Sequence, residues 1–189
     1  MPILRKKRGA SRKLILSSNQ AANIFYRPES GRLKLSSLCL NIMLSYLQED
    51  VNIPEAGGVL LGRYILDTQD IVIDEVTRPM IRDRRTRHGF FRSRENHQQV
   101  IDRAWKKSDG TCTYLGEWHT HPEAVPTPSI TDKINWQKKL LFDKFSRYLF
   151  FVVVGTTHLK IWEGEKRRYG FRPLWSVRGN GIHFDHNQS

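Results

Sequence analysis

The residues best suited to chemistry in this sequence are two histidines, His119 and His121, separated by one threonine. They lie in residues 112–121, a stretch whose composition predicts a β-strand. Side chains alternate between the two faces of a strand, so both imidazoles point to the same side. Asp132 follows in the first turn of a helix predicted to open at Ser129, and its carboxylate can reach the same point. Two histidines and one carboxylate form a three-ligand zinc site whose fourth position is left for water, as in catalytic zinc centres.

Each half of this pattern also has an ordinary structural interpretation. A His-x-His pair alone is a weak metal signal, and Ser129-x-x-Asp132 matches a helix capping box. The two halves together, in register along the chain, favour a metal site. The remaining histidines lack metal-like spacing and are expected to be structural or surface residues: His88, His97, His158, His183 and His186.

Glu117 shares the predicted strand face with the two histidines, because it lies two residues before His119. A fourth protein ligand would close the site to water. We therefore expect Glu117 to orient a ligand histidine, to touch substrate, or to be turned away by a bulge.

Length and composition indicate one compact domain. The chain has 189 residues, of which 39% are hydrophobic and 11% aromatic, so it can build a core and is not of the disordered class. No apolar run approaches the roughly 18 to 20 residues that cross a bilayer, and the basic N-terminus leads into no signal-peptide pattern. Two distant cysteines, Cys39 and Cys112, fit a reducing compartment. We expect a cytoplasmic protein without a membrane span.

The net charge of +12 is unevenly distributed. Residues 1–13 hold six Lys or Arg and no acid, and residues 78–94 hold seven Arg with Asp83 as the one acid. Such a field steers an acidic partner, although a solvated basic face that aids solubility remains an alternative. Nucleic acid is disfavoured, because no zinc finger, RNP-like aromatic motif or helix-turn-helix pattern accompanies the charge. The residues expected to face an acidic protein surface are Arg82, Arg84 and Arg85.

Hydrophobic periodicity predicts three helices and a sheet, which is an α/β layer structure. The helices are expected over residues 35–47, after Ser93 and after Ser129, the last with an inward face of Ile130, Ile134, Leu141 and Phe145. Strands are expected at 13–17, 57–66, 71–76, 88–92, 112–121, 148–154, 158–162 and 169–175. We expect a flexible basic arm at residues 1–13, one domain at 14–178 and a tail at 179–189.

Three segments in order resemble the JAMM motif of the JAB/MPN zinc metalloproteases, which include ubiquitin-specific isopeptidases and bacterial relatives. They are Glu55-Ala-Gly-Gly-Val-Leu-Leu-Gly62, then His119-Thr-His-Pro122, and, six residues later, Ser129-Ile-Thr-Asp132. The resemblance implies the family fold, an α-β sandwich in which about three helices flank a curved mixed sheet.

Carried over residue by residue, the resemblance implies that His119, His121 and Asp132 bind one Zn²⁺ per chain. Glu55 would be the general base, taking a proton from the zinc-bound water and passing it to the leaving amine. Ser129 would hydrogen-bond the developing oxyanion. Amide hydrolysis needs a base, an acid for the amine and a donor where charge develops, so the chemistry of these residues agrees.

The stretch from Gly116 to Glu123, the Arg-rich segment and the basic N-terminus are most similar to bacterial JAB proteins of antiphage CBASS operons. That similarity implies an isopeptidase that deconjugates the C-terminal tail of a cGAS-like nucleotidyltransferase from a lysine. Three other functions are considered: a JAMM protease that processes a ubiquitin-like or sulfur-carrier precursor, a non-catalytic MPN scaffold, and a basic nucleic-acid-binding module. The scaffold would lack a ligand or the base, and this chain has them all.

Overall fold

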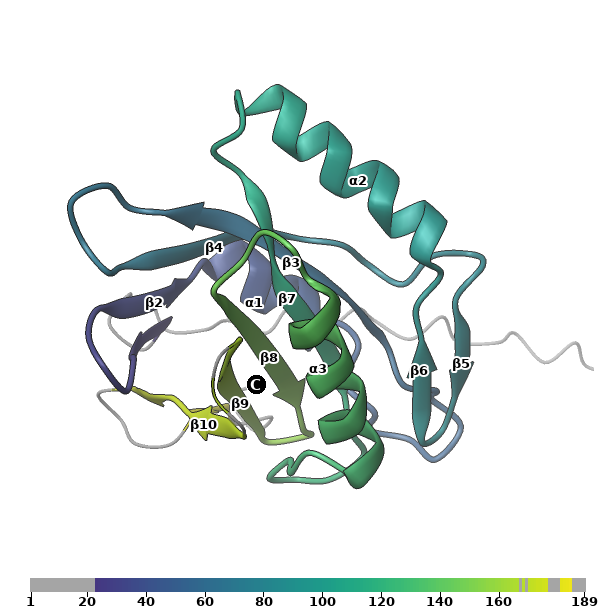
Figure 1. Ribbon diagram of the computed structural model, residues 1–189. Helices are drawn as coiled ribbons and strands as arrows, with labels where there is room; N and C mark the ends of the chain where they lie inside the picture. The colour runs from purple at the N-terminus through teal and green to yellow at the C-terminus, as the bar shows by residue number, and fades with distance from the viewer. Residues whose placement is uncertain (1–22, 167, 169, 177–180, 185–189) are drawn as a thin grey trace, which may run out of the picture.

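The computed structural model describes residues 23–166, 168, 170–176 and 181–184 (Figure 1). The helices in this part of the chain are α1 (Ser37–Leu44), α2 (Arg94–Lys107) and α3 (Ile130–Phe142). The strands are β1 (Ile24–Tyr26), β2 (Arg32–Leu35), β3 (Gly57–Tyr64), β4 (Ile71–Val76), β5 (Arg84–Thr86), β6 (Gly89–Phe91), β7 (Thr113–Thr120), β8 (Tyr148–Val154), β9 (His158–Glu165), β10 (Phe171–Pro173), β11 (Trp175–Ser176) and β12 (Ile182–His183).

One mixed sheet runs through the molecule in the order β10-β9-β8-β7-β3-β4-β2-β1-β11, with β12 beside β9. The pairs β7–β8 and β2–β4 are parallel, and the other pairs of this sheet are antiparallel. Its two outermost strands, β10 and β11, are separated in the chain by Leu174 alone, which is fully buried. The sheet must therefore curl until its edges approach each other, and the expected curved α/β architecture is confirmed.

The helices cover both faces of this sheet, as Figure 1 shows for α1 and α3. Strand β8 is buried throughout, and its residues alternate between the two sides. Phe150 and Val152 join the core cluster that contains α1, whereas Phe151 and Val153 pack with Trp136 of α3. The third helix, α2, packs on β3 and β7 on the same side of the sheet as α3. The face that carries α3 is also the face on which His119 lies, opposite the inward-pointing Trp118.

The inward face predicted for α3 is wrong. Ile130, Ile134, Leu141 and Phe145 are 77%, 51%, 63% and 93% exposed. The helix instead buries Trp136 and Leu140, which lie four residues apart on the face that carries Asp132. The aromatic ring of Trp136 stacks on Phe151, with 4.5 Å between the ring centroids.

Several element boundaries also differ from the prediction. α1 ends at Leu44, where the prediction extended to residue 47, and β1 and β2 were not predicted. The last predicted strand, 169–175, is divided into β10 and β11. β12 lies within the segment expected to be a tail, yet it pairs with β9, and Ile182 and Phe184 are buried in the core. The arm at 1–13 and the strand at 13–17 lie outside the described residues.

The short strands β5 and β6 form a separate two-stranded hairpin from the Arg-rich segment (Figure 1). The prediction placed a single strand there, at 88–92. The hairpin lies beside the start of β3, where a side chain on Gly57 would meet the ring of Phe90. Glycine at this position therefore lets the hairpin approach the sheet. No helix among the described residues is long and apolar enough to cross a membrane.

Candidate active site

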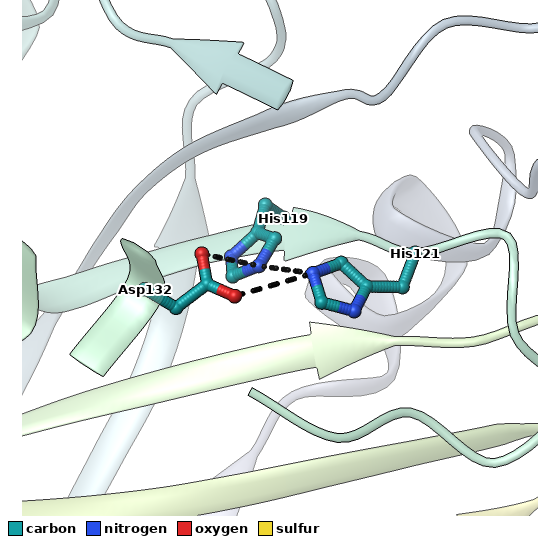
Figure 2. A group of neighbouring side chains, drawn as sticks. All are labelled: His119, His121 and Asp132. Carbon is teal, nitrogen blue, oxygen red and sulfur yellow. Dashed lines mark hydrogen bonds and ion pairs between the residues drawn. The ribbon is translucent and has the colours of Figure 1, made fainter. Parts of the chain in front are cut away.

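The structure brings His119, His121 and Asp132 together (Figure 2). The Nε2 atoms of the two histidines are 3.0 Å apart. Each Nε2 lies 3.4 Å from an oxygen of Asp132, His119 from Oδ1 and His121 from Oδ2. Ligand atoms at bond lengths of about 2.1 Å from a tetrahedral zinc are about 3.4 Å from one another. The three side chains therefore converge closely enough to share one metal ion, with ligand atoms within 4.8 Å of one another.

Strand β7 and the start of α3 position these groups. β7 pairs with β3 on one side and β8 on the other, and His119 lies opposite Gly57 and Val153. His121 follows the end of β7, where its backbone N–H donates to the carbonyl oxygen of Val154 at 2.8 Å. These backbone hydrogen bonds hold the chain at both histidines in place, and the side chains lie within 3.4 Å of Asp132.

The first turn of α3 orients Asp132 through a capping box with Ser129. The Ser129 hydroxyl lies 2.6 Å from Asp132 Oδ2 and accepts from the Asp132 N–H at 3.1 Å, while the Ser129 N–H donates to Oδ2 at 2.7 Å. The two interpretations of this motif are therefore compatible, because the capping box points the carboxylate at the histidines. Ser129 is itself exposed and can contact a substrate.

The electrostatics of the group favour cation binding. Burial by itself would raise the pKa of Asp132, but hydrogen bonds from His119 and His121 hold that pKa far below its usual range. Burial opposes the charged form of His121, yet the hydrogen bond and charge of Asp132 raise its pKa overall. A carboxylate that stays charged beside two imidazole nitrogens can hold a cation.

Glu55 is buried directly before β3, and burial raises its pKa to about 7. The charge of His121 lowers this pKa and that of Asp132 raises it, so Glu55 lies within the electrostatic field of the site. A carboxyl group that titrates near neutral pH can both accept and return a proton. Glu55 has the property that a general base needs.

Glu117 does not contact the two histidines through any hydrogen bond in the structure. Its Oε1 atom accepts from Arg92 at 2.9 Å and from Lys139 of α3 at 3.0 Å. Burial would raise the pKa of Glu117, but these two cations lower it overall. Since Glu117 is on β7 and Lys139 on α3, the ion pair ties together the elements that carry His119 and Asp132.

Sequence reasoning missed the groups that bind the backbone around Glu55. The Thr120 hydroxyl accepts from the Ala56 N–H at 2.9 Å and donates to Gln48 at 3.1 Å. Arg85 donates to the carbonyl oxygen of Glu55 at 2.7 Å. This is a correction for Arg85, which was expected to face an acidic partner and instead turns inward. The available signal for Thr120 was its polar side chain between the two site histidines, His119 and His121.

Comparisons with known proteins agree with this geometry. A family model described as prokaryotic homologs of the JAB domain matches residues 40–168. A CD-NTase/cGAS isopeptidase of Vibrio cholerae is 36% identical over 126 residues, which cover 67% of this chain and 76% of that protein. Another, from Escherichia coli, is 34% identical over 130 residues, covering 69% of this chain and 79% of that protein.

Two further similarities are more limited. A probable metalloprotease of Sinorhizobium fredii is 40% identical over 80 residues, covering 42% of this chain and 48% of that protein. The solution structure of a Desulfitobacterium hafniense protein superposes with a TM-score of 0.52 at 22% identity, covering 75% of this chain and 88% of that one, and so supports the fold alone. The match of the family model over most of the sequence, with two relatives more than 30% identical, shows that this chain belongs to the prokaryotic JAB domain family.

Proposed function

We propose that this chain is a zinc-dependent isopeptidase that hydrolyses the amide between the C-terminal tail of a protein and a lysine side chain. As a JAB-family protein it is a hydrolase. The observation that carries the proposal is the convergence of His119, His121 and Asp132 at separations of 3.0 to 3.4 Å. Two nitrogen ligands and one oxygen ligand suit zinc and leave its fourth position open.

In the proposed mechanism, His119, His121 and Asp132 would hold one zinc ion, which would lower the pKa of water toward about 7 and polarise a carbonyl group. Glu55 accepts a proton from the attacking water. As the carbon–nitrogen bond breaks, Glu55 returns that proton to the lysine amine, while the water oxygen stays on the new carboxyl group, whose remaining proton is lost to solvent or to the amine. The raised pKa of Glu55 supports this double role.

Ser129 is proposed as a donor to the oxyanion. Its exposed position at the start of α3, beside Asp132, supports this role. Since a hydroxyl has a single proton, donation to the oxyanion replaces the 2.6 Å hydrogen bond to Asp132 Oδ2.

Nucleophilic catalysis by cysteine is disfavoured by the state of both thiols. Cys39 and Cys112 are buried. Burial raises the pKa of Cys39 to about 11 and also raises that of Cys112, so neither thiol is ionised at neutral pH. A thiolate is the reactive form of cysteine, which favours direct attack by water.

The proposed substrate is the conjugate of a cGAS-like nucleotidyltransferase, and the proposed role is deconjugation in antiphage defence in the cytoplasm. The Vibrio cholerae and Escherichia coli relatives are named CD-NTase/cGAS isopeptidases, which supports the proposed substrate. An acidic surface of the conjugate is proposed to face Arg82 and Arg84, which are exposed in the Arg-rich segment.

Cleavage of two matched substrates tests this function. One carries the tail on a lysine ε-amine, and the other joins the same tail to the same protein through an ordinary peptide bond. Mass spectrometry should show a free tail carboxylate and an unmodified lysine from the first substrate, and chelation of the metal should prevent both. Cleavage of the linear fusion alone would replace this function by precursor processing, and binding of duplex DNA without cleavage of either would replace it by nucleic-acid binding.

A further inference from the structure

The backbone at Glu55 is bound from two sides, although Glu55 precedes β3. On one side, the Thr120 N–H of β7 donates to the carbonyl oxygen of Ala56 at 2.8 Å. On the other, the Glu55 N–H donates to the carbonyl oxygen of Thr86 in β5 at 2.8 Å. Glu55 therefore lies between the ligand strand and the β5–β6 hairpin, and its position depends on both.

Arg85 strengthens the contact from the hairpin. Its Nε atom donates to the carbonyl oxygen of Glu55 at 2.7 Å, and its Nη2 atom donates to that of Pro54 at 3.2 Å. A guanidinium group is planar and rigid, so two hydrogen bonds to successive carbonyls fix the direction of the chain at Glu55. Thr86 and Arg85 together satisfy both backbone groups of the residue proposed as the base.

A second arginine of the same segment binds the loop that leads to Glu55. Nη1 of Arg87 donates to the carbonyl oxygens of Asp50 and Ile53, the latter at 3.2 Å. The Gln48 amide donates to Ile53 at 3.1 Å and to the Arg87 carbonyl oxygen at 3.0 Å. The loop before Glu55 is thus hydrogen-bonded to the hairpin at Gln48, Asp50 and Ile53.

A buried network fastens the hairpin to the rest of the molecule. Asp83, before β5, accepts from the Ser93 N–H at 2.7 Å and from Nε2 of His97 at 3.1 Å. Nδ1 of His97 lies 2.7 Å from the hydroxyl of Thr77, which in turn accepts from the β3 residue Val59 at 2.8 Å. The side chains of Asp83 and His97 are fully buried. Both ends of the hairpin segment are therefore anchored, and the hairpin can act as a fixed support.

We propose that Arg85 is a positioning residue that holds the carboxylate of Glu55 in its productive place by binding the carbonyl oxygens of Pro54 and Glu55. The inference rests on the proposed function of Glu55 as the base. Among the described residues, Arg85 donates its hydrogen bonds to Pro54 and Glu55 and makes none with His119, His121 or Asp132, so it acts on the site through Glu55. Displacement of a catalytic group by about 1 Å costs roughly 10²-fold in rate.

The test compares Arg85→Ala with the parent on the lysine-linked conjugate. Turnover, kcat, should fall about 10- to 100-fold, whereas KM and the bound zinc per chain stay unchanged. Arg32→Ala is the matched control. Arg32 lies on β2, two positions from β3 in the sheet, and its guanidinium also makes two hydrogen bonds, both to Asp70. That variant should keep the parent kcat.

Chemical rescue separates positioning from a general loss of structure. Guanidinium chloride at tens of millimolar should restore part of the kcat of Arg85→Ala, and Arg85→Lys, which keeps the charge but loses the two-point contact, should fall between the variant and the parent. If Arg85→Ala does not fold, Arg85→Lys carries the test. Parent-like kcat in these variants, or a fall that simply follows lost zinc, would overturn the proposal.

A Glu55→Gln variant distinguishes failure of this inference from failure of the proposed function. An inactive Glu55→Gln with a fully active Arg85→Ala refutes the positioning role and leaves the base in place. An active Glu55→Gln refutes the base, and the positioning role with it. Guanidinium should not rescue Glu55→Gln, because that variant lacks the carboxylate itself.

Discussion

Asp132 serves the helix and the proposed metal site with the same carboxylate. Oδ2 accepts the Ser129 N–H of the capping box, and the two oxygens face the two histidines. A capping interaction fixes a side chain relative to its own helix. Because the helix start is thereby rigid, the carboxylate needs little rearrangement to bind a cation, which lowers the entropic cost of binding.

The double use of Ser129 leads to a prediction with a matched control. Ser129→Ala removes a helix cap, which costs about 1 kcal/mol of stability, and also the proposed oxyanion donor, which costs roughly 10²- to 10³-fold in kcat. Ser36 caps α1 by accepting from the Cys39 N–H at 3.2 Å. Ser36→Ala should therefore lose similar stability in urea denaturation and keep its kcat. Equal activity of the two variants would remove Ser129 from the mechanism.

The pKa of Glu55 predicts how activity depends on pH. Only the deprotonated carboxylate accepts a proton, so kcat/KM should rise with pH and level off above the pKa. Burial places that pKa at about 7 without a metal, and a nearby dication lowers it. We expect an acid limb whose midpoint lies between about 4.3, the value of a free glutamate, and about 7. Zinc content is measured at each pH as the control, and a flat profile at constant zinc would contradict the assignment.

At the scale of elements, α3 shows what the sequence could predict and what it could not. The spacing of His119, His121 and Asp132 was sufficient to predict their convergence, because strand alternation and a helix start are local geometry. The buried face of α3 could not be predicted in the same way, because apolar residues occur on more than one side of this helix. One side of α3 faces the site, and it carries Asp132, Trp136, Lys139 and Leu140. Orienting the helix by its ligand would have given the correct face.

The contacts that hold the backbone at Glu55 could not be predicted from the sequence, for a different reason. It depends on pairing between segments 30 residues apart, Arg85 with Glu55, and on a hairpin whose arginines bind backbone carbonyls. Hydrophobic periodicity along the sequence indicates helices and strands, and it gives no information on such contacts. The same arginines look in sequence like a charged surface, although Arg85 has an internal role.

The buried Asp83 network predicts a large effect on stability. Asp83→Ala leaves His97 and two backbone N–H groups, of Met80 and Ser93, without their acceptor. A buried donor that loses its acceptor costs about 1 to 3 kcal/mol, and three donors lose theirs here, so the total should be several times the effect of a surface substitution. Asp102→Ala is the control, since exposed Asp102 accepts a hydrogen bond from Gln98 on the same helix and no other from the described part of the chain. It should change stability by less than about 0.5 kcal/mol. Urea denaturation of both variants decides this, and similar midpoints would show that the network does not anchor the hairpin.

At the scale of the whole molecule, the uneven distribution of the +12 charge predicts that a protein substrate binds beside the Arg-rich segment, residues 78–94. Arg82 forms a surface ion pair with Glu95 at 3.0 Å, and the Arg84 guanidinium lies 5.2 Å from the centroid of the Phe91 ring. Both remain exposed and available to an acidic surface. Reversal of both to Glu should raise KM for the conjugate and leave cleavage of a short lysine-linked peptide unchanged, an effect that weakens at high salt.

Arg103→Glu with Lys106→Glu on α2 provides the control for this reversal, because both residues are exposed and the change in total charge is the same. Arg85 is left intact in both pairs, so Glu55 keeps its support. Equal KM values for the two double variants would show that net charge, and not the Arg-rich segment, attracts the substrate.

The most direct test of the central claim is a titration of the metal-stripped protein with zinc, in which cleavage of the lysine-linked conjugate is measured at each step. The account predicts no cleavage before zinc is added, a linear rise, and a break at about one zinc per chain. His121→Ala should show no rise over the same range, because it lacks one of the three ligands. Full cleavage by the stripped protein, or the same break in His121→Ala, would contradict a zinc isopeptidase built on His119, His121 and Asp132.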